Sequence, residues 1–371
     1  MLHTLFFEVY NMTLKYQLAD LQKKAKERTV KTQNIEYDLE TLVKKIDRKT
    51  IKLNPDYQRR HRWTTEASSR LIESLILNIP IPYVYISLDI DVDDEIDDED
   101  EQYRYSVIDG QQRITAIYEF MKNKYPLSGL EVLSSLNDSF YKDLPPFLIR
   151  RLEERTIKCL RIDSTVDSQV KYDIFERLNT GALKLESQEL RNAIYRGPFK
   201  DLLVELCLNS DFKKTTNLSE KKIAKMDDQE IILRFFSLHY KDGYKDYKRG
   251  FKKFLNDKME LFNGLSKNEL KEMKALFENT FKKIANSNID IPFSNWSNNK
   301  TFGELKKKSN FNVAIYDTVC RIYVLGNKKL TRKSLTDFLF SDPSYVEASS
   351  GSYNDISKLR ARMTKATELN K

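Results

Sequence analysis

The segment Ile108-Asp109-Gly110-Gln111-Gln112-Arg113 decides the fold of the N-terminal half, because two different periodicities meet there. Before it, residues 103–108 are rich in aromatic and branched side chains, which predicts a short strand. After it, apolar residues recur at helical spacing, at Ile114, Ile117, Tyr118 and Met121. Gly110 is therefore expected in a tight turn from strand to helix, where the missing Cβ permits close approach of a ligand.

This turn is a candidate anion site. The first N–H groups of the predicted helix and the Arg113 guanidinium would converge just beyond Gly110. The alternative is an ordinary tight turn with solvated glutamines, because a motif this short is weak by itself.

Three segments, in order, resemble the N-terminal domain of GmrSD-type restriction proteins, which belongs to the ParB/sulfiredoxin-like group. Asp109-Gly110-Gln111-Gln112-Arg113 resembles the central signature of that domain. Asn54-Pro55-Asp56-Tyr57-Gln58-Arg59, followed by Trp63, is similar to its first motif. Residues 175–181, followed by Glu189-Leu190-Arg191-Asn192, are similar to its third.

The resemblance implies a protein that binds a nucleoside triphosphate, with Mg²⁺ as a candidate companion, and that hydrolyses it or switches on binding it. It further implies a link to DNA sensing or restriction. The implied catalytic residues are Asp109, Gln112 and Arg113, where Arg113 would neutralise phosphate charge and Asp109 would orient water or a metal. The implied nucleotide contacts are Gln58, Arg59, Gly110, Gln111, Arg113 and Asn179. No metal site built from protein ligands alone is expected.

Several of these residues also have a purely structural interpretation. Trp63 is expected to act as a core anchor, although the run of arginines before it suits phosphate. Gly181 is suited to cap the preceding helix in the left-handed conformation, so Asn179 is either part of that helix end or a ligand contact. Glu189 and Arg191 are alternatively residues that position the next helix.

Charge points to a polyanionic partner. The chain has 63 Lys and Arg against 55 Asp and Glu, but ten of the acids lie in residues 89–101, which contain no base. Without that segment the remaining 358 residues carry 63 bases against 45 acids, a net charge of +18. This excess favours DNA or nucleotides, and the alternative is a lysine-rich set of solvated helix faces. The acidic segment is expected to form an exposed loop.

Several chemistries are disfavoured by the residues at hand. Histidines occur only at positions 3, 61 and 239, too dispersed for a histidine-dependent nuclease site, so cleavage of DNA would need a partner protein. Sulfiredoxin-like chemistry would need a cysteine where Gln111 stands. Three scattered cysteines and no evident membrane segment or signal peptide predict a cytoplasmic protein. The rival hypothesis is a non-catalytic module that binds DNA or protein and retains a degenerate nucleotide pocket.

The expected fold class is α+β: a small ParB/sulfiredoxin-like α/β domain followed by a mainly helical domain. The expected boundaries are a polar arm over residues 1–35, the α/β domain over 36–185 and the helical domain over 186–371. Predicted helices cover residues 37–46, 64–77 and 166–178, and predicted strands cover 50–53, 83–88, 103–108 and 157–162. Residues 213–217 are expected to separate two helices, and apolar residues from Ile231 to Leu238 are expected to be buried.

Overall fold

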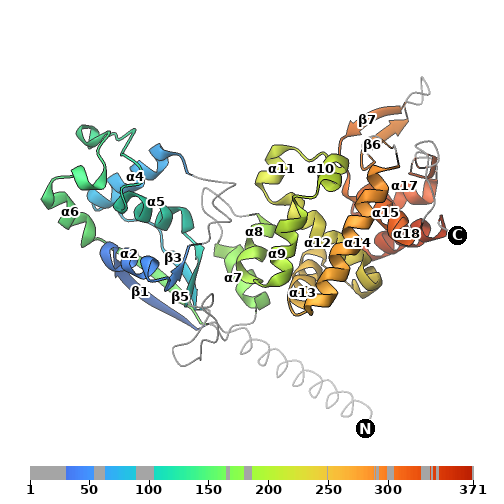
Figure 1. Cartoon of the computed structure of the whole chain (residues 1–371), viewed down its shortest axis with the longest axis horizontal. Coiled ribbons are helices and arrows are strands. Elements are labelled where there is room, and N and C mark those ends of the chain that lie inside the picture. The colour runs from blue at the N-terminus through green and yellow to red at the C-terminus, as the bar shows by residue number, and fades with distance from the viewer. Residues whose placement is uncertain are drawn as a thin grey trace, which may run out of the picture. The chain divides into compact units, whose positions relative to one another are not determined.

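The chain folds as two units, each with its own core: unit 1, Met1–Lys184, and unit 2, Leu185–Lys371 (Figure 1). They are seen in a computed structural model. It describes residues 31–53, 63–88, 104–163, 168–178, 186–248, 250–287, 289, 292–298, 305–326, 335, 337–339 and 342–369.

A mixed five-stranded sheet organises unit 1. Its strand order is β1-β5-β3-β4-β2, in which β1–β5 and β3–β4 are antiparallel pairs and β5–β3 and β4–β2 are parallel pairs. The strands are β1 (Thr32–Asp38), β2 (Ile51–Lys52), β3 (Val84–Leu88), β4 (Tyr105–Asp109) and β5 (Thr156–Ile162). The signature segment thus begins on β4, next to the central strand of the sheet.

Helices α2, α4, α5 and α6 lie on one side of this sheet and share a single core with it (Figure 1). Side chains at helical spacing from α4 and α5 meet Val84, Ile86 and Val107 from the strands. The helical segments of unit 1 are α2 (Leu39–Asp47), α4 (Thr65–Ile76), α5 (Gln111–Met121), the short 3₁₀ segments η2 (Ser134–Leu136) and η3 (Tyr141–Asp143), α6 (Pro146–Glu153) and α7 (Ser168–Leu178).

The helix starts follow from side-chain caps. The Thr64 hydroxyl accepts a hydrogen bond from the Ala67 N–H at 3.2 Å, as the sequence predicts for a helix that begins there. Asp38 accepts from the Thr41 N–H at 2.6 Å, which also lowers the pKa of its carboxyl group. Helix α2 therefore starts at Leu39, two residues later than predicted.

Strand β1 was not predicted, because residues 32–35 were assigned to a polar arm and residues 37–38 to the start of a helix. Its side chains are mostly exposed, and Tyr37 is its one buried residue. It lies at an edge of the sheet, where antiparallel pairing with β5 holds it in strand conformation. Its polar sequence alone does not predict a strand.

Unit 2 is mainly helical. Its helices are α8 (Ser187–Ile194), α9 (Pro198–Leu206), α10 (Ser210–Thr216), α11 (Glu220–Ala224), α12 (Asp227–His239), the 3₁₀ segment η4 (Tyr240–Asp246), α13 (Phe251–Asn263), α14 (Lys267–Ala285), α15 (Val313–Leu325), α17 (Pro343–Ser349) and α18 (Ile356–Glu368). All the apolar residues predicted to be buried between Ile231 and Leu238 are buried in α12. The α+β class, with a sheet domain followed by a mainly helical one, is confirmed.

Two details of unit 2 differ from prediction. Residues 213–216 belong to α10, which Asn209 caps by accepting from the Phe212 N–H at 2.9 Å. Phe212 is buried and anchors this otherwise polar helix, which has too few apolar positions for a periodic pattern. An antiparallel hairpin of β6 (Asn295–Asn298) and β7 (Leu305–Ser309) interrupts the helical region.

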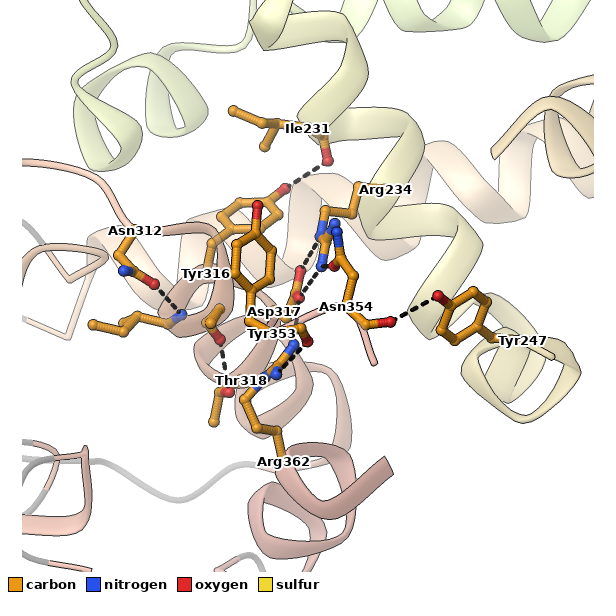
Figure 2. A network of polar contacts seen from close by, with 12 residues as sticks. Ile231, Arg234, Tyr247, Asn312, Tyr316, Asp317, Thr318, Tyr353, Asn354 and Arg362 are labelled. Atoms are coloured by element: carbon orange, nitrogen blue, oxygen red, sulfur yellow. Dashed lines mark hydrogen bonds and ion pairs between the residues drawn. The ribbon is translucent and has the colours of Figure 1, made fainter. Parts of the chain in front are cut away.

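A buried polar network joins α12, α15 and α18 in unit 2 (Figure 2). The Arg234 guanidinium donates twice to the Asp317 carboxylate, from Nε and Nη2, each at 2.5 Å. Arg362 donates to the same carboxylate at 3.3 Å. Because all three side chains are buried, Asp317 is the shared counter-charge of two arginines.

Candidate functional site

The signature turn, residues 109–113, lies where β4 ends and α5 begins. Asp109 is the last residue of β4, Gly110 is the N-cap and Gln111 is the first residue of the helix. This is the predicted strand-turn-helix arrangement. It places Asp109, the Gln111 and Gln112 side chains and the first N–H groups of α5 at one end of the sheet.

Gly110 is required for two reasons. Its φ of +92° lies in the left-handed region, where other residues are strained. A Cβ at this position would lie 2.8 Å from Val84 Cγ2 and 3.1 Å from Arg113 Nη2. The glycine therefore lets β3 and the arginine pack directly against the turn.

We expect Gly110→Ala to lower the free energy of unfolding by about 2–3 kcal/mol, the sum of left-handed strain and overpacking against Val84. Gly129→Ala is the matched control, since Gly129 in the same unit also has positive φ (+65°). Its Cβ would meet the flexible Glu66 side chain at 3.1 Å, which can move aside. Urea unfolding followed by circular dichroism measures both, and equal losses would contradict the packing argument.

Arg113 is held inside the protein. Its Nη2 donates to Asp109 Oδ2 at 2.9 Å and its Nη1 donates to the Pro82 carbonyl oxygen. Its side chain is 12% exposed, whereas that of Asp109 is 35% exposed. Burial lowers the pKa of Arg113, and the neighbouring Asp109 acts in the opposite direction. The guanidinium that was expected to face a phosphate is thus paired with a carboxylate of the same turn.

Gln112 links the signature turn to the end of the first motif. The Trp63 N–H donates to Gln112 Oε1 at 3.2 Å, and the Trp63 side chain packs against the core of unit 1. Trp63 therefore lies beside the signature turn, in the anchoring role expected of it. Gln58 and Arg59, the predicted contacts from the first motif, fall outside the described residues, as does the acidic segment 89–101.

Buried Cys159 lies behind the turn on β5. Burial raises the pKa of its thiol to about 11, and the nearby Arg113 acts in the opposite direction. A thiol that stays protonated at neutral pH is a poor nucleophile.

Glu73 and the Pro82 carbonyl are structural partners that the sequence did not reveal. The Glu73 carboxylate, buried on α4, accepts from the Val132 and Leu133 N–H groups at 2.9 and 2.7 Å. It thereby fixes a loop almost 60 residues away. Pro82 contributes a backbone oxygen, which has no signature in sequence because every residue carries one.

The Glu189–Asn192 segment of the third motif lies on α8, in unit 2. Arg191 is buried and donates to Asn256 on α13 at 2.8 Å, to Gln188 at 3.0 Å and to Glu230 on α12 at 2.7 Å. Asn192 donates to Gln229 at 2.6 Å. These residues join α8 to α12 and α13, as the structural interpretation expected. Asn179, the predicted ligand residue of this motif, falls outside the described residues.

His239 is the one histidine among the described residues, and it is buried at the end of α12. Burial, together with Arg321 and Arg234, lowers its pKa to about 3. A buried imidazole with so low a pKa is a weak base, so it is unsuited to activating water for phosphodiester cleavage. Within the described ranges, no group of three or more His, Cys, Asp or Glu side chains could hold a metal ion.

No helix in the described part of the chain has the length and apolar character needed to cross a membrane.

Comparison with known proteins bears on unit 1 and α8. No curated protein matches the chain in sequence. Residues 39–196 match the family described as the GmrSD restriction endonuclease, N-terminal domain. The match contains the signature turn, Trp63 and the Glu189–Asn192 segment, which are the elements that carried the resemblance in the sequence. The match confirms the resemblance carried by these segments: residues 39–196 of this chain are similar to the N-terminal domain of the GmrSD restriction endonuclease family.

Proposed function

We propose that this chain is a component of a DNA-restriction or phage-defence system, in which the GmrSD N-terminal domain binds a nucleoside triphosphate at the signature turn. The observation that carries the proposal is the Asp109–Gly110–α5 junction. It combines a Cβ-free turn, an 11-residue helix that begins at the turn, and an arginine in the first helical turn. A helix N-terminus of this kind favours anions, since its N–H groups lack intrahelical partners.

Each residue of the turn has a proposed role. The N–H groups at the start of α5 and Arg113 would hold phosphate oxygens, while Gly110 lets the ligand approach the backbone. Asp109 would orient a water molecule or a Mg²⁺ ion carried by the nucleotide, so hydrolysis is part of the proposal. Gln112 would hold the Trp63 backbone, and so the end of the first motif, in register with the turn. Gln58, Arg59, Gln111 and Asn179 are proposed as further contacts.

DNA is the second proposed partner, and unit 2 is the part of the chain that would bind it. Residues 185–371 contain 35 Lys and Arg against 24 Asp and Glu, a net charge of +11, whereas residues 1–184 contain 28 against 31, a net charge of −3. A basic body attracts the DNA backbone without reading its sequence. Because the three histidines of the chain, at positions 3, 61 and 239, are too dispersed in sequence for a histidine-dependent nuclease site, cleavage is assigned to a partner nuclease.

The test is binding and hydrolysis of ATP, GTP, CTP and UTP with Mg²⁺ by the purified chain, measured by calorimetry and phosphate release. We expect Arg113→Lys, which keeps the charge but loses the two-pronged donor, to weaken binding by about 10- to 100-fold. Arg150→Lys, at an exposed position of α6, is the matched control and should bind like the parent. Failure of the parent chain to bind any of the four nucleotides would refute the proposal.

A non-catalytic DNA-binding or protein-interaction module is the second candidate. The observation that favours it is the pairing of Arg113 with Asp109 and Pro82, which gives the arginine a structural role without any ligand. The same preparation distinguishes the two. This candidate predicts no nucleotide binding, together with DNA binding whose affinity falls steeply between about 50 and 200 mM salt.

A further inference from the structure

Within the signature turn, Asp109 and Arg113 are bonded to each other. Arg113 Nη2 lies 2.9 Å from Asp109 Oδ2, which is the distance of a charge-assisted hydrogen bond. The pair is electrically neutral as a whole. A phosphate that used this guanidinium would therefore have to take the place of a carboxylate that is already bonded to it.

The two members of the pair are not equally accessible. The Asp109 side chain is 35% exposed and the Arg113 side chain is 12% exposed. A polyanion that approaches the turn therefore meets the carboxylate before the guanidinium. The negative charges of the polyanion and of Asp109 repel each other, and solvent screens this repulsion only in part because Asp109 is partly buried. The pair therefore lowers the affinity of the signature turn for anions, whereas the N–H groups at the start of α5 raise it.

The two contacts of Arg113 also differ in kind. The Pro82 carbonyl belongs to the backbone just before β3, so it has little freedom to move. The Asp109 carboxylate sits on a short side chain that can change rotamer at modest cost. Arg113 could therefore keep its bond to Pro82 while exchanging Asp109 for a phosphate oxygen, and the missing Cβ of Gly110, which would lie 3.1 Å from Nη2, adds no obstruction there.

We infer that Asp109 is an internal competitor for polyphosphate and sets the affinity of the signature turn for it. The inference rests on the proposed nucleotide site and adds one element to it: the aspartate occupies the arginine until a polyphosphate displaces it. On this basis, removing the Asp109 charge should strengthen anion binding, whereas a purely structural Asp109–Arg113 pair would give no gain.

The test is calorimetric binding of inorganic tripolyphosphate to the full chain in EDTA, compared between parent and Asp109→Asn. Without metal, any role of Asp109 in holding Mg²⁺ cannot contribute. We expect Asp109→Asn to bind tripolyphosphate about tenfold more tightly than the parent. The matched control is Asp47→Asn, because Asp47 is 38% exposed and pairs with Lys122 at 2.6 Å elsewhere in unit 1. It removes the same charge and should leave the affinity unchanged.

The outcomes separate the inference from the proposed function. A gain for Asp109→Asn that is absent in Asp47→Asn, and is abolished by adding Arg113→Lys, supports the inference. A parent chain that binds tripolyphosphate, with no gain or a loss in Asp109→Asn, overturns the inference and leaves the nucleotide site standing. A lack of tripolyphosphate binding by the parent and by Asp109→Asn overturns the inference, while binding of the four nucleotides with Mg²⁺ decides the proposed function separately. Circular dichroism of each variant verifies that the fold is retained.

Discussion

Replacing Asp317 by alanine is expected to lower the free energy of unfolding of unit 2 by about 3–5 kcal/mol, because it strands two buried guanidinium groups. Arg234 and Arg362 both donate to this carboxylate and are themselves buried. Arg234 also donates to Asn354 at 2.9 Å, and Arg362 donates to the carbonyl oxygens of Ala348 and Tyr353, each at 2.7 Å. Those neutral acceptors would remain, but none of them carries a compensating charge.

Two further variants isolate the charge from the volume. Asp317→Asn keeps the shape and one acceptor oxygen, so a loss close to that of alanine would assign the effect to charge. Asp257→Ala removes an exposed carboxylate that pairs with Lys253 at 3.0 Å on α13, and should change stability by less than about 0.5 kcal/mol. Urea unfolding followed by circular dichroism provides the comparison. An Asp317→Asn variant as stable as the parent would show that the two arginines need no counter-charge.

Arg191→Ala is the second substitution with a large expected effect, again about 3–5 kcal/mol. Arg191 is buried on α8 and its guanidinium reaches Asn256, Gln188 and Glu230. Truncation leaves a cavity and removes the donor from three acceptors, two of which are buried. Because the loss is one of stability, nucleotide affinity measured well below the unfolding transition should not change.

Arg360→Ala is the control, since Arg360 is exposed on α18 of the same unit and should shift stability by less than about 0.5 kcal/mol. Calorimetric unfolding and nucleotide binding are measured on the same samples. If Arg191→Ala kept the stability of the parent but lost nucleotide binding, the third motif would have a ligand-binding role in place of the structural one.

The sequence predicted the elements whose residues carry a local pattern. Aromatic and branched residues before Gly110 and helical spacing after it located the signature turn, and Thr64 located the start of α4. Strand β1 was missed because this edge strand has mostly polar, exposed side chains. The pattern cannot report which partners meet across the fold.

At the site, too, the sequence predicted which residues form the turn but not their contacts with residues far away in the chain. The residues of the turn could be named in advance, but the bond from Arg113 to the Pro82 carbonyl could not, because it joins residues 31 positions apart through a backbone oxygen. The partners of Arg191 on α12 and α13 lie 39 and 65 positions away. Only the folded chain decides whether such an arginine meets a ligand or another part of the protein.

The segment that matches the family does not end where unit 1 ends, and helix α8 lies in the difference between them. The family match runs to residue 196, whereas unit 2 begins at Leu185 and includes α8. A fragment that ends at residue 196 would contain Gln188, Arg191 and Asn192 but would lack helices α12 and α13, which supply hydrogen-bond partners of the last two. The polar face of α8, which is buried in the whole chain, would then be exposed to solvent. For expression of the N-terminal domain, a terminus between α7 and α8 respects the packing, and the recognisable boundary at residue 196 does not.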